Sequence, residues 1–138
     1  MEAMNKIHYR KRRSYKYTLD DGYWIETEFR TGCDLACSDM ISLSAAGLLR
    51  IAAGYAWDGP SGIAIDTKNF MRGSLVHDAL YQLMREGLLS REHRDAVDRL
   101  LEKICLEDGM SKLRAAWVYQ AVKRFGAKAA EPDVLEAP

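Results

Sequence analysis

Serine and glycine residues mark where helices begin and end in the second half of this 138-residue chain. Ser90 precedes one helical pattern that Gly109 closes, and Ser111 precedes another that Gly126 closes. A serine side chain satisfies free backbone N–H groups at a helix start, and glycine readily adopts the conformation that ends a helix. These boundaries predict two consecutive helices between residues 90 and 126, which leaves little freedom for the fold of that segment.

Apolar residues recur at helical spacing in both of these segments and in one segment before them. The earlier helix is expected to start near Thr67–Asn69 and to end at Gly87, with an apolar face made of Val76, Leu80, Leu83 and Met84. The second helix is expected to bury Val97, Leu100, Leu101, Ile104 and Cys105. The third helix is expected to bury one face formed by Leu113, Trp117, Ala121 and Phe125.

The first half of the chain has the alternating pattern and the turn signals of β-strands. The runs 15–19, 23–29, 40–44 and 48–51 are rich in β-forming residues, and Asp20-Asp21-Gly22 predicts a hairpin turn between the first two runs. An antiparallel meander is the simplest way to join them. The chain is therefore expected to have an α+β fold, in which an N-terminal antiparallel β-meander is followed by three α-helices and the first two helices form an antiparallel pair.

Composition is that of one globular domain, since 48% of the residues are hydrophobic and 29% are charged. We expect a single α+β domain over residues 1–126, with a β half at 9–57 and an α half at 58–126. Residues 127–138, AKAAEPDVLEAP, are polar and rich in Ala and Pro, so we expect them to form a flexible C-terminal tail.

Overall charge and cysteine content give little support to a nucleic-acid partner or to a zinc site. Lys and Arg together number 20, as do Asp and Glu, so the balance does not favour a specific nucleic-acid partner. The three cysteines lack zinc-site spacing, and neither a signal peptide nor a transmembrane stretch is predicted. Residues 8–16, HYRKRRSYK, form a basic cluster that is expected to be a solvated arm or to make weak contact with an anionic surface.

The segment HDALY, residues 77–81, contains the strongest candidates for chemistry. His77 and Asp78 are adjacent, so on a helix they point about 100° apart and suit two separate tasks. A histidine acts as a general base near neutral pH, and a carboxylate beside it can hold a cation. Tyr81 is one turn from both residues and is expected to pack half-buried with its hydroxyl satisfied.

Asp98 lies at the edge of the apolar stripe of the second helix, and a carboxylate turned toward a core usually has a partner. Arg94, one turn earlier, is one candidate partner, and the ring of His77 across the helix pair is the other. A carboxylate on one ring nitrogen of His77 would fix its tautomer and leave the other nitrogen free to take a proton. The sequence thus predicts either a structural ion pair or a His77–Asp98 dyad, with Asp78 turned toward the loop at 57–62.

That loop, WDGPSG, precedes the first helix and is rich in glycine. Its backbone carbonyls can converge on one point, and hard cations such as calcium prefer oxygen ligands. Asp58 is most simply the polar residue of an Asp-Gly turn. The residue types therefore suit attack by water on an ester with a calcium ion nearby.

Several of these segments together resemble the phage and bacterial family known as domain of unknown function 1353. The resemblance covers about Tyr15 to Gly126 and rests on WDGPS at 57–61, SLVHDALY at 74–81, Arg94 to Asp98, and YQAVKRFG at 119–126. It implies a phage or prophage origin, in the cytoplasm of a bacterial host or in a virion. It implies no activity.

The α half also resembles the small phospholipases A2, especially their bacterial and fungal branch, which carry a calcium loop and a helix with His-Asp-x-x-Tyr. The resemblance implies that His77 is the base, that Asp98 orients it, and that Asp78 binds Ca²⁺. It further implies backbone carbonyl ligands in the loop, to which we assign Trp57, Gly59 and Ser61. The implied substrate is a phospholipid or another ester.

This chain departs from those enzymes at several points. Leu80 and Pro60 occupy positions where cysteine is usual, and the β half has no counterpart. Two functions therefore remain open. One is a calcium-assisted His-Asp ester hydrolase, and the other is a non-catalytic phage or prophage protein, structural or host-interacting, with the same helical scaffold.

Overall fold

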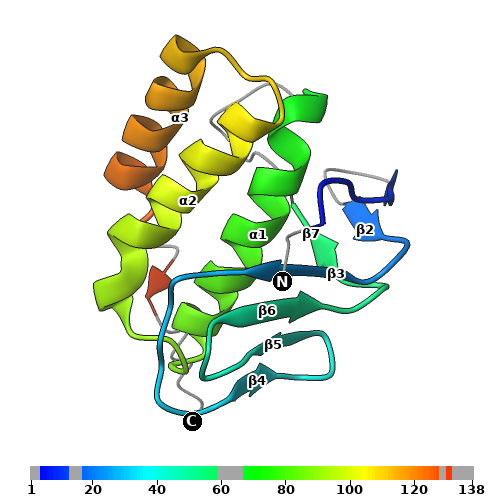
Figure 1. The fold of residues 1–138 in the computed structure, drawn as a ribbon, viewed down its shortest axis with the longest axis vertical. Coiled ribbons are helices and arrows are strands. Elements are labelled where there is room, and N and C mark those ends of the chain that lie inside the picture. Colours follow the sequence, from blue (N-terminus) through cyan, green and yellow to red (C-terminus); the bar gives the residue numbers. More distant parts are fainter. Residues whose placement is uncertain (1–3, 13–16, 59–66, 128–129, 132–138) are drawn as a thin grey trace, which may run out of the picture.

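The computed structural model describes residues 4–12, 17–58, 67–127 and 130–131, which form antiparallel strands in two sheets followed by helices (Figure 1). One sheet has the order β1-β2-β7, with β1 at Tyr9–Lys11, β2 at Tyr17–Leu19 and β7 at Ala56–Trp57. The other has the order β3-β6-β5-β4, with β3 at Tyr23–Glu26, β4 at Leu35–Cys37, β5 at Ile41–Leu43 and β6 at Leu48–Ile51. The helices are α1 (Lys68–Arg85), α2 (Arg94–Glu107) and α3 (Lys112–Phe125), and a short 3₁₀ helix, η1 (Arg91–His93), leads into α2. The predicted α+β fold is confirmed.

The predicted hairpin across Asp20-Asp21-Gly22 is wrong, because β2 and β3 belong to different sheets. β2 pairs with β1 on one side and with β7 on the other, so both of its edges are already used. The backbone N–H of Leu19 also donates to Tyr55, and that of Asp20 donates to His8. Residues 20–22 therefore carry the chain from one sheet to the next, where β3 pairs with β6.

The helix boundaries agree closely with the serine and glycine signals. The Ser90 hydroxyl accepts a hydrogen bond from the Glu92 N–H, and the Ser111 hydroxyl accepts one from the Arg114 N–H. Gly87 and Gly109 follow α1 and α2 with φ of 73° and 96°, the left-handed region that favours glycine. These two glycines allow the chain to reverse direction twice, so that successive helices are antiparallel.

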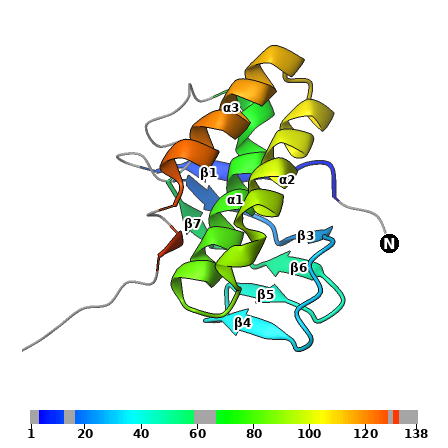
Figure 2. The ribbon, with the colours of Figure 1, turned by 90° about the vertical axis from the view of Figure 1, so that its left-hand side faces the viewer.

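Helix α1 lies in the middle of the molecule, between the strands and α2, and α2 lies between α1 and α3 (Figures 1 and 2). The main core joins the inner faces of the strands to α1, and among its most buried side chains are Leu43, Leu49, Leu75 and Leu80. A second apolar cluster joins α2 and α3 to the start of α1 and includes Phe70, Leu101, Cys105, Val118 and Val122. Helix α1 contacts the strands on one side and α2 on the other. Its position therefore determines where the candidate site, described below, lies in the fold.

The predicted buried face of α3 is wrong. Leu113 is 84% exposed and Trp117 is 54% exposed, whereas Ala115, Val118 and Val122 are buried. The helix is therefore rotated relative to the expected orientation, because the smaller residues Ala115 and Val118 allow a close contact with α2. Ala121 is half-buried, and the Phe125 side chain lies outside the described part of the structure.

The predicted tail, residues 127–138, is described only at 127, 130 and 131. Ala130 is fully buried in the main core cluster, and its N–H donates to the carbonyl of Gly126. The chain therefore packs on the domain at Ala130. Within the described residues, every helix is too short or too polar to cross a membrane.

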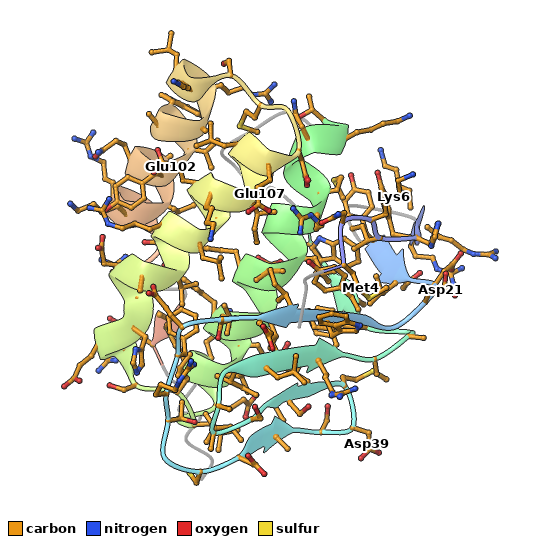
Figure 3. All side chains as sticks on the ribbon, viewed as in Figure 1. Met4, Lys6, Asp21, Asp39, Glu102 and Glu107 are labelled. Atoms are coloured by element: carbon orange, nitrogen blue, oxygen red, sulfur yellow. The ribbon has the colours of Figure 1, made fainter. Side chains whose placement is uncertain are left out.

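The buried guanidinium of Arg72 connects four parts of the fold. It donates to both carboxylate oxygens of Asp108 at 3.0–3.2 Å and to Glu107 at 2.9 Å. It also donates to the Tyr23 hydroxyl at 3.0 Å and to the backbone carbonyl of Met4 at 3.1 Å. Figure 3 shows Met4 in the N-terminal segment and Glu107 at the end of α2, with α1 between the two residues in this view. No pattern in the sequence marks Arg72 or predicts this network.

We expect Arg72→Ala to lower the free energy of unfolding by about 3–5 kcal/mol, because it leaves partly buried carboxylates without their cation. Chemical denaturation measures this loss. Arg99→Ala is the control, because Arg99 forms an exposed pair with Asp95 at 3.0 Å. Its loss should stay below about 1 kcal/mol. Equal losses for both variants would contradict a special role for Arg72.

Candidate functional site

The candidate site forms where α1 and α2 approach most closely. A Cβ atom added to Gly73 would lie 2.8 Å from Cδ1 of Leu101 and 3.2 Å from Sγ of Cys105. Gly73 therefore allows α1 to lie directly against α2. His77 and Tyr81 follow at intervals of four residues, so they lie on the same face of α1 and also point toward α2.

We expect Gly73→Leu to lower the free energy of unfolding by about 2–3 kcal/mol, since the larger side chain must push the two helices apart. Urea denaturation measures the effect. Lys68→Leu adds a similar side chain at an exposed position of α1 and should be nearly neutral. A Gly73→Leu protein as stable as this control would show that the helices do not depend on the close contact.

His77, Asp98 and Tyr81 form one hydrogen-bonded cluster across the helix pair. Nε2 of His77 lies 2.8 Å from Oδ1 of Asp98, and the Tyr81 hydroxyl donates to the same oxygen at 2.6 Å. The His77 and Tyr81 rings stack with their centroids 4.1 Å apart. The structure thus confirms the predicted contact between His77 and Asp98 and adds Tyr81 as a second donor.

This arrangement decides which nitrogen of His77 can act as a base. An ionised carboxylate only accepts hydrogen bonds, so a neutral His77 carries its proton on Nε2 and leaves Nδ1 as an acceptor. Nδ1 has no hydrogen-bond partner within the part of the chain that the structure describes. The His77 side chain keeps 11% of its surface exposed, whereas that of Asp98 keeps 1%. The hydrogen bond to Asp98 therefore fixes the orientation of the His77 ring, and a ring held in this way could accept a proton on Nδ1.

Arg94, the other predicted partner of Asp98, stays farther away. Its Nη1 lies 3.9 Å from Oδ2 of Asp98, beyond hydrogen-bonding distance, and donates instead to the backbone carbonyl of Lys123 at 3.2 Å. Among the described residues, Oδ2 of Asp98 has no hydrogen-bond partner. Asp98 is therefore bonded to the His77–Tyr81 pair, and Arg94 supplies a nearby positive charge.

The Tyr81 hydroxyl is held in its donor form. Burial raises the pKa of Tyr81, and the hydrogen bond to Asp98 raises it further. A Cβ atom added to Gly126 would lie 2.7 Å from this hydroxyl, so the chain after α3 passes close over the cluster. The sequence marked Gly126 only as a helix end, and it contains no pattern that predicts this contact.

Asp78 points away from this cluster and toward the start of the loop. Burial raises the pKa of Asp78 to about 6, the His77 and Arg85 charges lower it, and the charge of Asp58 raises it. A backbone hydrogen bond from Asp58 also lowers the pKa of Asp78. Asp78 therefore faces Asp58, as the predicted orientation toward the loop requires.

A cation near Asp58 and Asp78 would relieve the repulsion that contributes to the raised pKa of Asp78, and carboxylate oxygens are ligands that calcium accepts. Among the described residues, no group of three or more acidic, His or Cys side chains is placed to hold a metal ion. Of the predicted carbonyl ligands, Gly59 and Ser61 lie outside the described residues. Trp57 ends β7, and its indole N–H donates to the Ser74 hydroxyl at 3.1 Å, which ties the start of the loop to α1.

We expect Asp78→Asn to raise the free energy of unfolding by about 1–2 kcal/mol at pH 7.5 in the presence of a chelator. The pKa of Asp78 in the folded chain, about 6, exceeds its ordinary 3.8, so the folded state is penalised as pH rises through that interval. The stabilisation should therefore shrink as pH falls toward 4. Thermal unfolding at the two pH values measures it. A variant less stable than the parent at pH 7.5 would contradict the assigned environment of Asp78.

The chain matches no protein-family model, no curated protein and no solved structure in comparisons with known proteins.

Proposed function

We propose that this protein is a calcium-assisted ester hydrolase in which His77 is the general base. The observation that carries the proposal is the contact of His77 Nε2 with the buried Asp98 carboxylate, which leaves Nδ1 as the ring nitrogen that can accept a proton. Asp78, adjacent in sequence, faces a second direction and a second carboxylate. In this proposal, one turn of α1 carries the base, His77, and the cation ligand, Asp78, next to each other, as the resemblance to the small phospholipases A2 implies.

In this mechanism Nδ1 of His77 removes a proton from water as the water oxygen attacks the ester carbonyl carbon. The tetrahedral intermediate then breaks its bond to the alcohol oxygen, and His77 returns the proton to that leaving oxygen. The products are a carboxylic acid and an alcohol. Asp98 stabilises the imidazolium formed in the first step, and Tyr81 holds Asp98 in place.

A calcium ion bound by Asp78 and by loop carbonyls of Trp57, Gly59 and Ser61 would supply positive charge to the ester carbonyl oxygen. The chain's own contribution is to hold His77 beside that position. The substrate we propose is a phospholipid or another ester, and the basic cluster 8–16 would add weak attraction to an anionic surface. The phage or prophage origin implied by the first resemblance belongs to the same proposal.

The test measures release of fatty acid from phospholipid vesicles with calcium present. We expect His77→Ala to lower the rate by about 10²–10⁴-fold, the range that a general base contributes. Asp98→Asn should lower it by a smaller factor, because the base survives with its tautomer and orientation no longer fixed. His93→Ala is the matched control, since His93 lies on η1 against Phe29 and should leave the rate unchanged.

Two outcomes would contradict the proposal. One is the lack of any ester hydrolysis by the full chain with calcium, in which case the non-catalytic phage scaffold becomes the better function. The other is hydrolysis that survives His77→Ala. Under the non-catalytic reading, Asp98→Asn should only lower the melting temperature, because a neutral amide oxygen accepts weaker hydrogen bonds from the His77 ring and the Tyr81 hydroxyl than a carboxylate does.

A further inference from the structure

Helix α3 has an apolar pair on its outermost face. Leu113 and Trp117 are one helical turn apart and are 84% and 54% exposed. The face that packs on α2 is formed by Ala115, Val118 and Val122. At about 100° per residue, Leu113 and Trp117 lie nearly opposite the centre of that buried face. They therefore project away from the domain.

Basic residues surround this pair, and α3 has no acidic residue in its sequence KLRAAWVYQAVKRF. The basic residues are Lys112, Arg114, Lys123 and Arg124. Lys112, Arg114 and Arg124 make no ion pair with any residue that the structure describes. Lys123 lies over the Tyr119 ring, with Nζ 5.8 Å from its centroid. The outer face of α3 thus combines two large apolar side chains with a positive charge that no carboxylate of the helix balances.

We propose that this α3 surface, formed by Leu113, Trp117 and the flanking bases, docks on an anionic phospholipid bilayer. Leucine and tryptophan insert at the boundary between headgroups and acyl chains, where the indole ring keeps its N–H in contact with water. Lysine and arginine on the same face interact with anionic headgroups, and their long side chains reach the headgroups from the flanks of the helix. The inference concerns membrane binding and holds whether or not the protein hydrolyses esters.

A second copy of the chain is a less suitable occupant of this surface. Two α3 helices facing one another would bring together eight basic groups and no acidic ones from those helices. Two apolar side chains also offer far less than the roughly 800 Å² per partner that a stable interface needs. The charge of α3 complements a lipid surface and opposes self-association.

The basic cluster near the N-terminus is less suited to this role. Arg10 in β1 is paired with Asp20 at 2.8 Å, and His8 with Asp21 at 2.9 Å. Carboxylates therefore neutralise part of that cluster, and no large exposed apolar residue is described beside it. The α3 surface has the combination of apolar and basic groups that the N-terminal cluster lacks.

The test uses the full chain with vesicles of phosphatidylcholine containing phosphatidylglycerol, in the presence of a chelator. Trp57 is buried and Trp24 is half-buried, so a blue shift of tryptophan emission on binding reports mainly on Trp117. We expect co-sedimentation with these vesicles and little with pure phosphatidylcholine. Trp117→Ser should weaken binding at least about tenfold, because each large apolar side chain adds substantially to insertion. Raising the salt concentration should also weaken it.

Further variants separate the α3 surface from the rest of the molecule. Lys112→Glu combined with Arg124→Glu should weaken binding at least about tenfold while keeping Leu113 and Trp117 intact. Leu88→Ser removes another exposed leucine, 40% exposed after α1, and should bind like the parent. His77→Ala should also bind like the parent, which separates this inference from the proposed activity. Circular dichroism confirms that each variant is folded.

Several results would overturn the docking of α3 on lipid. They are a parent chain that does not bind the anionic vesicles, a Trp117→Ser chain that binds as tightly as the parent, and loss of binding on Arg10→Ala with α3 unchanged. A concentration-dependent dimer that Trp117→Ser abolishes would instead assign the surface to a second copy of the chain.

Discussion

The close approach of α1 and α2 at Gly73 is the constraint on which the rest of the structure depends. Without a side chain at that position, α1 lies directly against Leu101 and Cys105 of α2. The two helices run antiparallel, so moving along α1 in one direction moves along α2 in the other. The contact at Gly73 therefore sets which residues of the two helices meet. Toward the C-terminal end of α1, His77 meets Asp98, and toward its N-terminal end, Arg72 meets Asp108.

These two polar contacts have different energetic consequences. Arg72 has five acceptors among carboxylates, a hydroxyl and a carbonyl, so its burial is compensated by hydrogen bonds on all sides. Asp98 is more buried, yet Oδ2 has no hydrogen-bond partner in the described part of the chain. A fully buried carboxylate with an incomplete set of partners is costly. Such a cost is common at sites where a group is held for chemistry rather than for stability.

Asp78, on the neighbouring face of α1, adds a second unfavourable contribution to the free energy of folding. Its carboxylate is partly removed from water and faces Asp58, and both effects raise the pKa of Asp78. The presence of two costly carboxylates, one at each side of His77, distinguishes this turn of α1 from the Arg72 turn that precedes it.

The sequence could predict what depends on local rules. Ser90, Ser111, Gly87 and Gly109 determine helix ends by capping and by left-handed φ, so those boundaries were correct. The His77–Asp98 contact could be predicted because each residue lies a similar number of turns from the joint between the helices. The hairpin predicted at Asp20-Asp21-Gly22 is wrong because a turn signal predicts that the chain changes direction. It does not predict that the strands before and after the turn pair with each other. β2 pairs instead with β1, which precedes it in the chain, and with β7, which is distant in sequence.

The rotation of α3 could not be predicted for a related reason. Leu113, Trp117, Ala121 and Phe125 have helical spacing, but so do Ala115, Val118 and Val122, and hydrophobicity alone favours the larger set. Which face of α3 is buried depends on the surface of α2, where α1 already covers one side of Leu101 and Cys105. Small residues fit the remaining space, so the large ones turn outward. The same α2 helix therefore holds Asp98 beneath His77 and sets which face of α3 meets solvent. The Arg94 bond to the Lys123 carbonyl and the contact of Gly126 with Tyr81 join the end of α3 to the candidate site.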